Sequence, residues 1–210
     1  MCMNTPTDLR DVHRTAVLAS ADIVAAVTRD DLQRPTPCVG WTLSDLLIHM
    51  TVQHHGFAAA ARGAGADPAV WNPATVADAV IADPAGAYRR AVEDVLGAFG
   101  ADGVLEAPFT LGELGPEASF PGATAVGFHF IDYVVHGWDA ARSIDAPFEL
   151  SDDVIAAAVP IALAVPDGDF RSAEGSVFAR GLSGTDGQGD VDLILRHLGR
   201  SPDWAPTVVG

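Results

Sequence analysis

The sequence predicts a single, mainly α-helical domain with a short C-terminal extension. Apolar residues recur at three- and four-residue steps over several long stretches, which is the pattern of helices with one buried face. Proline and glycine gather between these stretches, where they end helices. Polar residues that cap helices stand where two of the stretches begin. The 210 residues, of which 49% are hydrophobic and 19% charged, suffice for one sizeable core.

The first half of the chain predicts two helices joined by a rigid connection. The first helix is expected over about Asp8 to Thr28. A proline-rich connection over residues 34–40 follows it, because the residue before a proline avoids the α region. Thr42 is then a good N-cap, and Asp45 can reach back to it as in a capping box. We therefore expect a second helix from Leu43 to about Arg62.

The second half predicts further helices around one long loop. The segment Thr75 to Phe99 carries a third helical pattern, broken near Asp83 and Pro84. Residues 106–120 are rich in glycine and proline and predict a long loop or a short β-excursion, of the kind that often borders a site. Helices are then expected over Ala123 to Ser143, over Asp152 to Leu163, and over Asp190 to His197 with Gly199 closing it, and a short strand over Ser176 to Ala179. We expect residues 1–165 to form the helical domain and residues 166–210 an extension that packs on it.

The charge balance excludes several classes of function. The chain has 28 acidic and 12 basic residues, a net charge of −16 that repels nucleic-acid phosphates and anionic lipid surfaces. All basic residues are arginines, and the absence of lysine excludes Schiff-base and pyridoxal enzymes, lysine-containing phosphate loops and kinases. The longest apolar run, Val154 to Val165, is far shorter than the ~20 residues of a membrane helix. With no signal-peptide pattern at the N-terminus either, we expect a cytoplasmic protein.

The two cysteines cannot build a disulfide framework, which fits a reducing compartment. Cys2 lies at the terminus. Cys38 is read as a small buried hydrophobe rather than a reactive thiol, because nothing cationic sits beside it in the sequence.

A group of polar residues on the helix over 123–143 is the strongest functional signal. Asp132 and His136 lie one turn apart on one face, and His129 lies one turn before Asp132 on the same face. Burying such groups without partners costs several kcal/mol, so either hydrogen-bonding partners or a metal ion must satisfy them. Helical bundles complete such sites with a residue from another helix. His49 and His54 of the second helix are both candidates, and spacing alone does not choose between them.

Three segments of the chain resemble one known family. Thr36 to Met50 and Asp132 to Arg142 are similar to the DinB-like, mycothiol-dependent maleylpyruvate isomerase N-terminal family. Leu198 to Trp204 looks like the closing motif of an actinobacterial branch of that family. The resemblance covers nearly the whole chain, in the right order and spacing.

The resemblance implies an up-down-down-up four-helix bundle with one divalent metal held by His49, Asp132 and His136. Zinc is the first choice for the metal, with nickel, iron or manganese also open. The family isomerase has glutamate where this chain has the shorter Asp132. Many DinB-like relatives use three histidines, which makes His129 a reserve ligand or a substrate-facing group. Asp139 could orient the His136 imidazole, or cap the helix or face solvent.

The function that the resemblance implies is chemistry on mycothiol, a low-molecular-weight thiol that would bind at the open metal position. We expect an isomerase or S-transferase, acting on a small-molecule substrate, with a homodimer possible. The family isomerase has a further C-terminal domain, whereas about 50 residues follow the expected last helix of the bundle here. Arg180 could approach a carboxylate substrate, or simply be solvated. The alternative is a non-catalytic module that binds the metal, or binds a small molecule in an apolar pocket around Trp41, Trp138 and Phe130.

Overall fold

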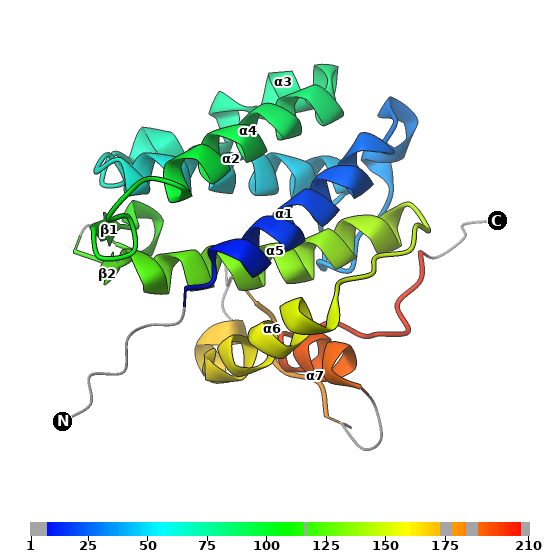
Figure 1. The fold of residues 1–210 in the computed structure, drawn as a ribbon. Helices are drawn as coiled ribbons and strands as arrows, with labels where there is room; N and C mark the ends of the chain where they lie inside the picture. The colour runs from blue at the N-terminus through cyan, green and yellow to red at the C-terminus, as the bar shows by residue number, and fades with distance from the viewer. Residues whose placement is uncertain (1–7, 116, 173–177, 184–188, 207–210) are drawn as a thin grey trace.

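Four long helices make the body of the molecule (Figure 1). The computed structural model describes residues 8–115, 117–172, 178–183 and 189–206. The long helices are α1 (Arg10–Ala25), α2 (Leu43–Ala61), α4 (Pro84–Phe99) and α5 (Gly122–Ser143), and the shorter ones are α3 (Ala77–Ala82), α6 (Asp152–Ala164) and α7 (Asp190–His197). The expectation of a mainly helical fold is confirmed.

In the part of the chain that the structure describes, two short strands and five short 3₁₀ turns connect the helices. Strand β1 (Pro108–Thr110) pairs antiparallel with β2 (Ser119–Pro121), so that Phe109 lies opposite Phe120. The β-excursion expected between residues 106 and 120 is therefore a small hairpin. The turns are η1 (Arg29–Gln33), η2 (Pro68–Trp71), η3 (Pro73–Thr75), η4 (Gly112–Leu114) and η5 (Asp169–Ser172).

The direction of each helix follows from two hydrophobic clusters. One cluster joins Val24 near the end of α1 to Leu43 at the start of α2, and also contains Tyr88 of α4 and Ala140 of α5. The other cluster joins the final turns of α2 and α4 to the first turns of α5. Helices α1 and α5 therefore run one way and α2 and α4 the other. This is the up-down-down-up order of a DinB-like bundle, in which α1 and α2 each pack against α4 and α5.

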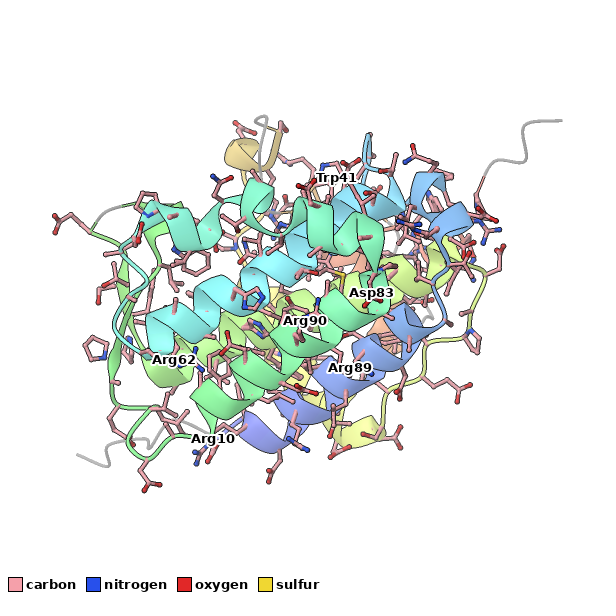
Figure 2. The ribbon with its side chains drawn as sticks, turned by 90° about the horizontal axis from the view of Figure 1, so that it is seen from above. Arg10, Trp41, Arg62, Asp83, Arg89 and Arg90 are labelled. Carbon is pink, nitrogen blue, oxygen red and sulfur yellow. The ribbon has the colours of Figure 1, made fainter. Side chains whose placement is uncertain are left out.

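Local sequence signals set two of the helix starts. The Thr42 Oγ1 accepts a hydrogen bond from the Asp45 backbone N–H, and the Thr42 backbone N–H donates to the Asp45 carboxylate, 2.9 Å away. This capping box confirms the expected start of α2. The predicted break before Pro84 is confirmed too: α3 ends at Ala82, and Asp83, at the start of α4 (Figure 2), accepts a hydrogen bond from the Gly86 N–H at 2.9 Å.

Helices α6 and α7 pack on the outer face of α5. Ile194 and Leu198 share a cluster with Phe130 and Val134 of α5 and with residues of α6. Of the strand expected over 176–179, residues 176 and 177 lie outside the described residues, and Phe178 and Ala179 are not in a strand. The prediction is wrong there because the Ala179 carbonyl accepts from the Arg171 side chain instead of a neighbouring strand. No helix in the described part of the chain is both long and apolar enough to cross a membrane.

Candidate metal centre

The structure brings together the three residues expected to hold a metal. His49 of α2 faces Asp132 and His136 of α5, and one ligand atom from each lies within 4.8 Å of the other two. The His136 Nε2 is 3.3 Å from Asp132 Oδ1, and the His49 Nε2 is 3.9 Å from Asp132 Oδ2. Ligand atoms bound tetrahedrally at the usual zinc distances lie roughly 3.3 Å apart. The donor set and its spacing therefore fit a divalent ion.

The centre is closed toward the bundle and open on the His49 side. His136 is 2% exposed and Asp132 9% exposed, whereas a quarter of the His49 side chain is exposed. Trp41, just before α2 (Figure 2), places its ring 5.1 Å from the His49 ring in an edge contact, and is itself partly exposed. Solvent therefore reaches this side of the centre, at His49 and Trp41.

A further carboxylate, Glu113, which the sequence did not single out, lies within electrostatic reach of Asp132. Gln53, one turn after His49, donates a hydrogen bond to Glu113 of η4 at 2.6 Å. Loss of solvation and the negative charge of Asp132 raise the pKa of Glu113, against the effect of that hydrogen bond. The one sequence signal for Glu113 was its position in a loop expected to border a site.

The three expected ligands differ in how burial and neighbouring charges shift their pKa values. Burial would raise the pKa of Asp132, but His136, His49 and Arg200 hold it below its ordinary value. Burial lowers the pKa of His49 to about 4, although Asp132 opposes this shift, so His49 keeps a free lone pair at neutral pH. Burial would also lower the pKa of His136, but Asp132, Asp139 and Cys38 raise it well above its usual value. A metal ion would have to displace that proton from His136.

The far side of His136 faces a buried carboxylate. The His136 Nδ1 lies 2.9 Å from Asp139 Oδ2, and Asp139 is fully buried. The structure thus places Asp139 where it can orient the imidazole and not at the surface. Cys38, His136 and Asp139 form a second group with metal-ligand spacing.

Cys38 is not the simple hydrophobe that the sequence suggested. Its Sγ donates to Asp139 Oδ2 at 3.2 Å and lies 3.3 Å from the Arg200 Nη2. The expectation failed because the cation comes from a residue 162 positions away in the sequence. Cys38 is only partly buried.

His129, the reserve ligand, belongs to a different group of side chains. Its Nδ1 lies 2.8 Å from His13 Nε2 and its Nε2 lies 3.2 Å from His54 Nδ1. All three histidines are buried, and His129 and His54 stack on Tyr133. Neither metal-capable group found among the described residues contains His129 or His54. Geometry therefore favours His49 over His54 as the ligand from α2.

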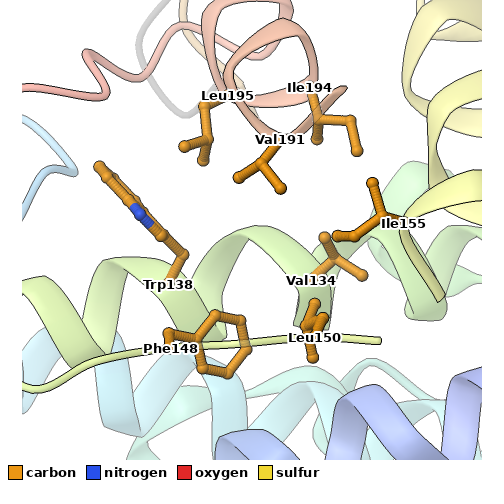
Figure 3. Close-up of a pocket in the computed structure, with 8 residues that line it drawn as sticks. All are labelled: Val134, Trp138, Phe148, Leu150, Ile155, Val191, Ile194 and Leu195. Carbon is orange, nitrogen blue, oxygen red and sulfur yellow. The ribbon is translucent and has the colours of Figure 1, made fainter. Parts of the chain in front are cut away.

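The residues considered for substrate binding are spread over the molecule. A small cavity of about 30 Å³ (Figure 3) is lined by Trp138, Val134, Phe148 and Leu150, together with Ile155 and residues of α7. At 100° per residue, Val134 and Trp138 lie on the face of α5 opposite Asp132 and His136. Phe130 is a buried core residue of the α5–α6–α7 cluster. Arg180 pairs with Asp167 and Asp169 at 3.3 and 2.7 Å and is half exposed.

Comparisons with known proteins place the chain in a family. Residues 13–141 match the model of the mycothiol maleylpyruvate isomerase N-terminal domain. Two proteins of Mycobacterium tuberculosis, uncharacterized protein MT0763 of strain CDC 1551 / Oshkosh and uncharacterized protein Rv0738 of strain H37Rv, are each 29% identical over 189 residues, which is 90% of this chain and 96% of theirs. No solved structure matches. The matched segment contains His49, Asp132 and His136 and covers more than half of the chain, which therefore belongs to the mycothiol maleylpyruvate isomerase N-terminal domain family.

Proposed function

We propose that the chain binds one divalent metal ion on His49, Asp132 and His136 and uses it to act on a low-molecular-weight thiol such as mycothiol. The reaction would be S-transfer to an electrophilic small molecule or a thiol-dependent isomerisation. The observation that carries the proposal is the convergence of two imidazole nitrogens and a carboxylate oxygen within 4.8 Å of one another, with an approach past His49. Three protein ligands with an open position are typical of catalytic rather than structural zinc.

Zinc suits two imidazoles and one carboxylate, and nickel, iron and manganese accept the same donors. When bound, such an ion would lower the pKa of a thiol that enters its open position.

Residues of the chain would orient the ligand His136 and accept the proton of the thiol. Asp139 would hold the His136 imidazole in place through its Nδ1, 2.9 Å away. The thiol has to lose its proton before its sulfur attacks carbon, and Glu113, whose carboxylate lies close enough to feel the charge of Asp132, would accept that proton. Its raised pKa makes it a better base than an ordinary glutamate. Gln53 fixes the position of Glu113 with the hydrogen bond at 2.6 Å.

A non-catalytic metal- or small-molecule-binding module is the second candidate. It is favoured by the placement of the cavity lined by Trp138 and Phe148, which lies on the other face of α5 from the three expected ligands. A molecule held in that cavity would not touch the metal. A cytoplasmic location and a homodimer remain predictions for both candidates.

Thiol conjugation tests the proposal. Protein loaded with zinc or nickel is incubated with mycothiol and a panel of electrophiles, and loss of free thiol is followed. The enzyme hypothesis expects turnover that disappears in Asp132→Ala. It also expects turnover to survive in His55→Ala, because His55 lies on α2 but pairs with Asp94, 3.1 Å away, outside the centre. Metal binding without turnover on any electrophile would favour the non-catalytic module.

A further inference from the structure

His136 has a metal-capable group on each side. Its Nε2 faces Asp132 and His49, whereas its Nδ1 faces Asp139 and Cys38. The second group, Cys38 with His136 and Asp139, has ligand atoms within 4.8 Å of one another, just as the first has. Sulfur, nitrogen and oxygen donors at such spacing would suit zinc or cobalt.

The positively charged side chain of Arg200 already lies within this second group. The Arg200 Nη2 is 3.1 Å from Asp139 Oδ2 and 3.3 Å from Cys38 Sγ, and its Nε is 3.3 Å from the same Asp139 oxygen. The remaining Arg200 nitrogen, Nη1, donates to the Leu198 carbonyl at 2.8 Å. Arg200 is 5% exposed and Asp139 is fully buried. The guanidinium therefore supplies the positive charge that the buried carboxylate requires.

The turn after α7 positions Arg200 beside Cys38 and Asp139. The Arg200 backbone N–H donates to the Leu195 carbonyl at 2.8 Å, and the Gly199 N–H donates to the Arg196 carbonyl at 3.1 Å. These two bonds close α7 as a Schellman motif, with Gly199 at a φ of 80°. Phe178 lies against the guanidinium, with its ring centre 5.4 Å from the Arg200 Cζ. The extension thus delivers the Arg200 side chain to Asp139, in the last turns of α5.

We propose that Arg200 is a positioning residue of the metal centre with two effects. It holds the Asp139 carboxylate so that Asp139 accepts a hydrogen bond from the His136 Nδ1–H, which leaves the lone pair of Nε2 directed at His49 and Asp132. It also closes the group of Cys38, His136 and Asp139 to a second metal ion, so that the chain binds one ion and not two. This inference rests on the proposed metal centre.

The test compares two arginines that both bind the C-terminal segment. Arg200→Met removes the charge at Asp139 and keeps much of the side-chain volume. Arg142→Met is the matched control, because Arg142 donates to the Trp204 carbonyl at 3.1 Å and contacts Trp138 but not the centre. Arg200→Lys keeps the charge and loses the planar fork.

Two measurements are made on each folded, metal-stripped protein. Zinc affinity is measured by competition with a chelator, and cobalt binding by absorbance, where a thiolate ligand gives a sulfur-to-cobalt charge-transfer band. We expect wild type and Arg142→Met to bind one ion without that band. We expect Arg200→Met to bind zinc about ten- to a hundredfold more weakly at the first site. It should also take up a second cobalt ion with the sulfur band, with the Nδ1 proton of His136 released to solvent so that the imidazolate bridges the two ions. Cys38→Ser in the same chain should abolish that band.

The outcomes separate this inference from the proposed function. If wild type binds no metal, both fail. If wild type binds one ion and Arg200→Met binds one ion with the affinity of Arg142→Met and no sulfur band, the role of Arg200 is wrong and the proposed function stands. If Arg200→Met does not fold, Arg200→Lys decides: zinc affinity equal to that of Arg142→Met contradicts the positioning role.

Discussion

Asp139 Oδ2 lies 2.9 Å from His136 Nδ1, and no part of Asp139 is exposed. A buried carboxylate against the far nitrogen of an imidazole is the arrangement that orients metal-binding histidines in many proteins. The Arg200 guanidinium balances the charge of Asp139, which would otherwise be costly to bury. The Asp139–Arg200 pair therefore joins the C-terminal segment to α5, next to His136.

Asp139→Asn should destabilise the protein strongly. The substitution keeps the shape of the side chain but leaves the buried Arg200 charge without its partner, which typically costs about 3–5 kcal/mol. Denaturant unfolding of metal-stripped protein measures the loss. Asp94→Asn is the control, because Asp94 pairs with His55 and Arg62 near the surface and should cost less than about 1 kcal/mol. Equal losses in the two variants would contradict the account of the Asp139 pair.

Thr42→Ala should lower stability by about 1 kcal/mol, because it removes the Oγ1 that caps α2. Thr42→Ser keeps the hydroxyl and should lose much less. The free energy of unfolding in denaturant measures both. If Thr42→Ala and Thr42→Ser have the same free energy of unfolding, the capping box does not stabilise the start of the helix that carries His49.

Gly199→Ala should destabilise, and Gly97→Ala should not. Gly199 has a φ of 80°, and a Cβ there would lie 2.7 Å from the Ala179 Cβ and 2.8 Å from the Ala179 carbonyl oxygen. The left-handed conformation alone costs a non-glycine residue about 1–2 kcal/mol. Gly97 lies inside α4 with open space around its Cβ position, so alanine should stabilise by about 0.5–1 kcal/mol. Thermal unfolding of both variants should therefore shift the Tm in opposite directions, and a Gly199→Ala protein as stable as wild type would contradict the strained turn.

The buried chain of His13, His129 and His54 should make the protein sensitive to acid. Burial lowers the pKa of His13 to about 3 and holds the pKa values of His54 and His129 well below their usual value. Unfolding lets each histidine take up a proton below about pH 6.5 that the folded state does not bind. Above that pH, the protonation of these histidines does not change the free energy of unfolding. Below it, each buried histidine lowers the free energy of unfolding by about 1.4 kcal/mol per pH unit.

The free energy of unfolding is compared between wild type and His54→Phe from pH 7.5 to 4.5, in buffer that contains a chelator. The phenylalanine should pack between Tyr133 and Tyr88, which contact the His54 ring. The variant should lose stability less steeply below pH 6.5, by about 1.4 kcal/mol per pH unit. Identical slopes would mean that His54 takes up its proton in the folded protein.

Much of the bundle could be predicted because its signals are local. The start of α2 depends on Thr42 and Asp45, three residues apart, and the break before α4 on Asp83 and Pro84. Helical periodicity likewise put Asp132 and His136 on one face of α5. The prediction of a strand near Phe178 was wrong, because a short apolar run does not determine which neighbour forms hydrogen bonds with its backbone.

The surroundings of the centre could not be predicted, because their contacts join distant parts of the chain. Arg200 reaches Asp139 across 61 residues, and Cys38 reaches Asp139 across 101. Periodicity also suggested His54 as readily as His49. The bundle decides between them by placing His54 against His129 and His49 against Asp132.

The most direct test of the metal centre is the metal content per chain of protein purified without chelator. It is measured for wild type, for His49→Ala, Asp132→Ala and His136→Ala, and for His55→Ala as the control from the same helix. The account predicts close to one divalent ion per chain in wild type and His55→Ala, and a large loss in each of the other three. A wild-type protein that is folded and metal-free, and that does not take up added zinc or nickel, would contradict it.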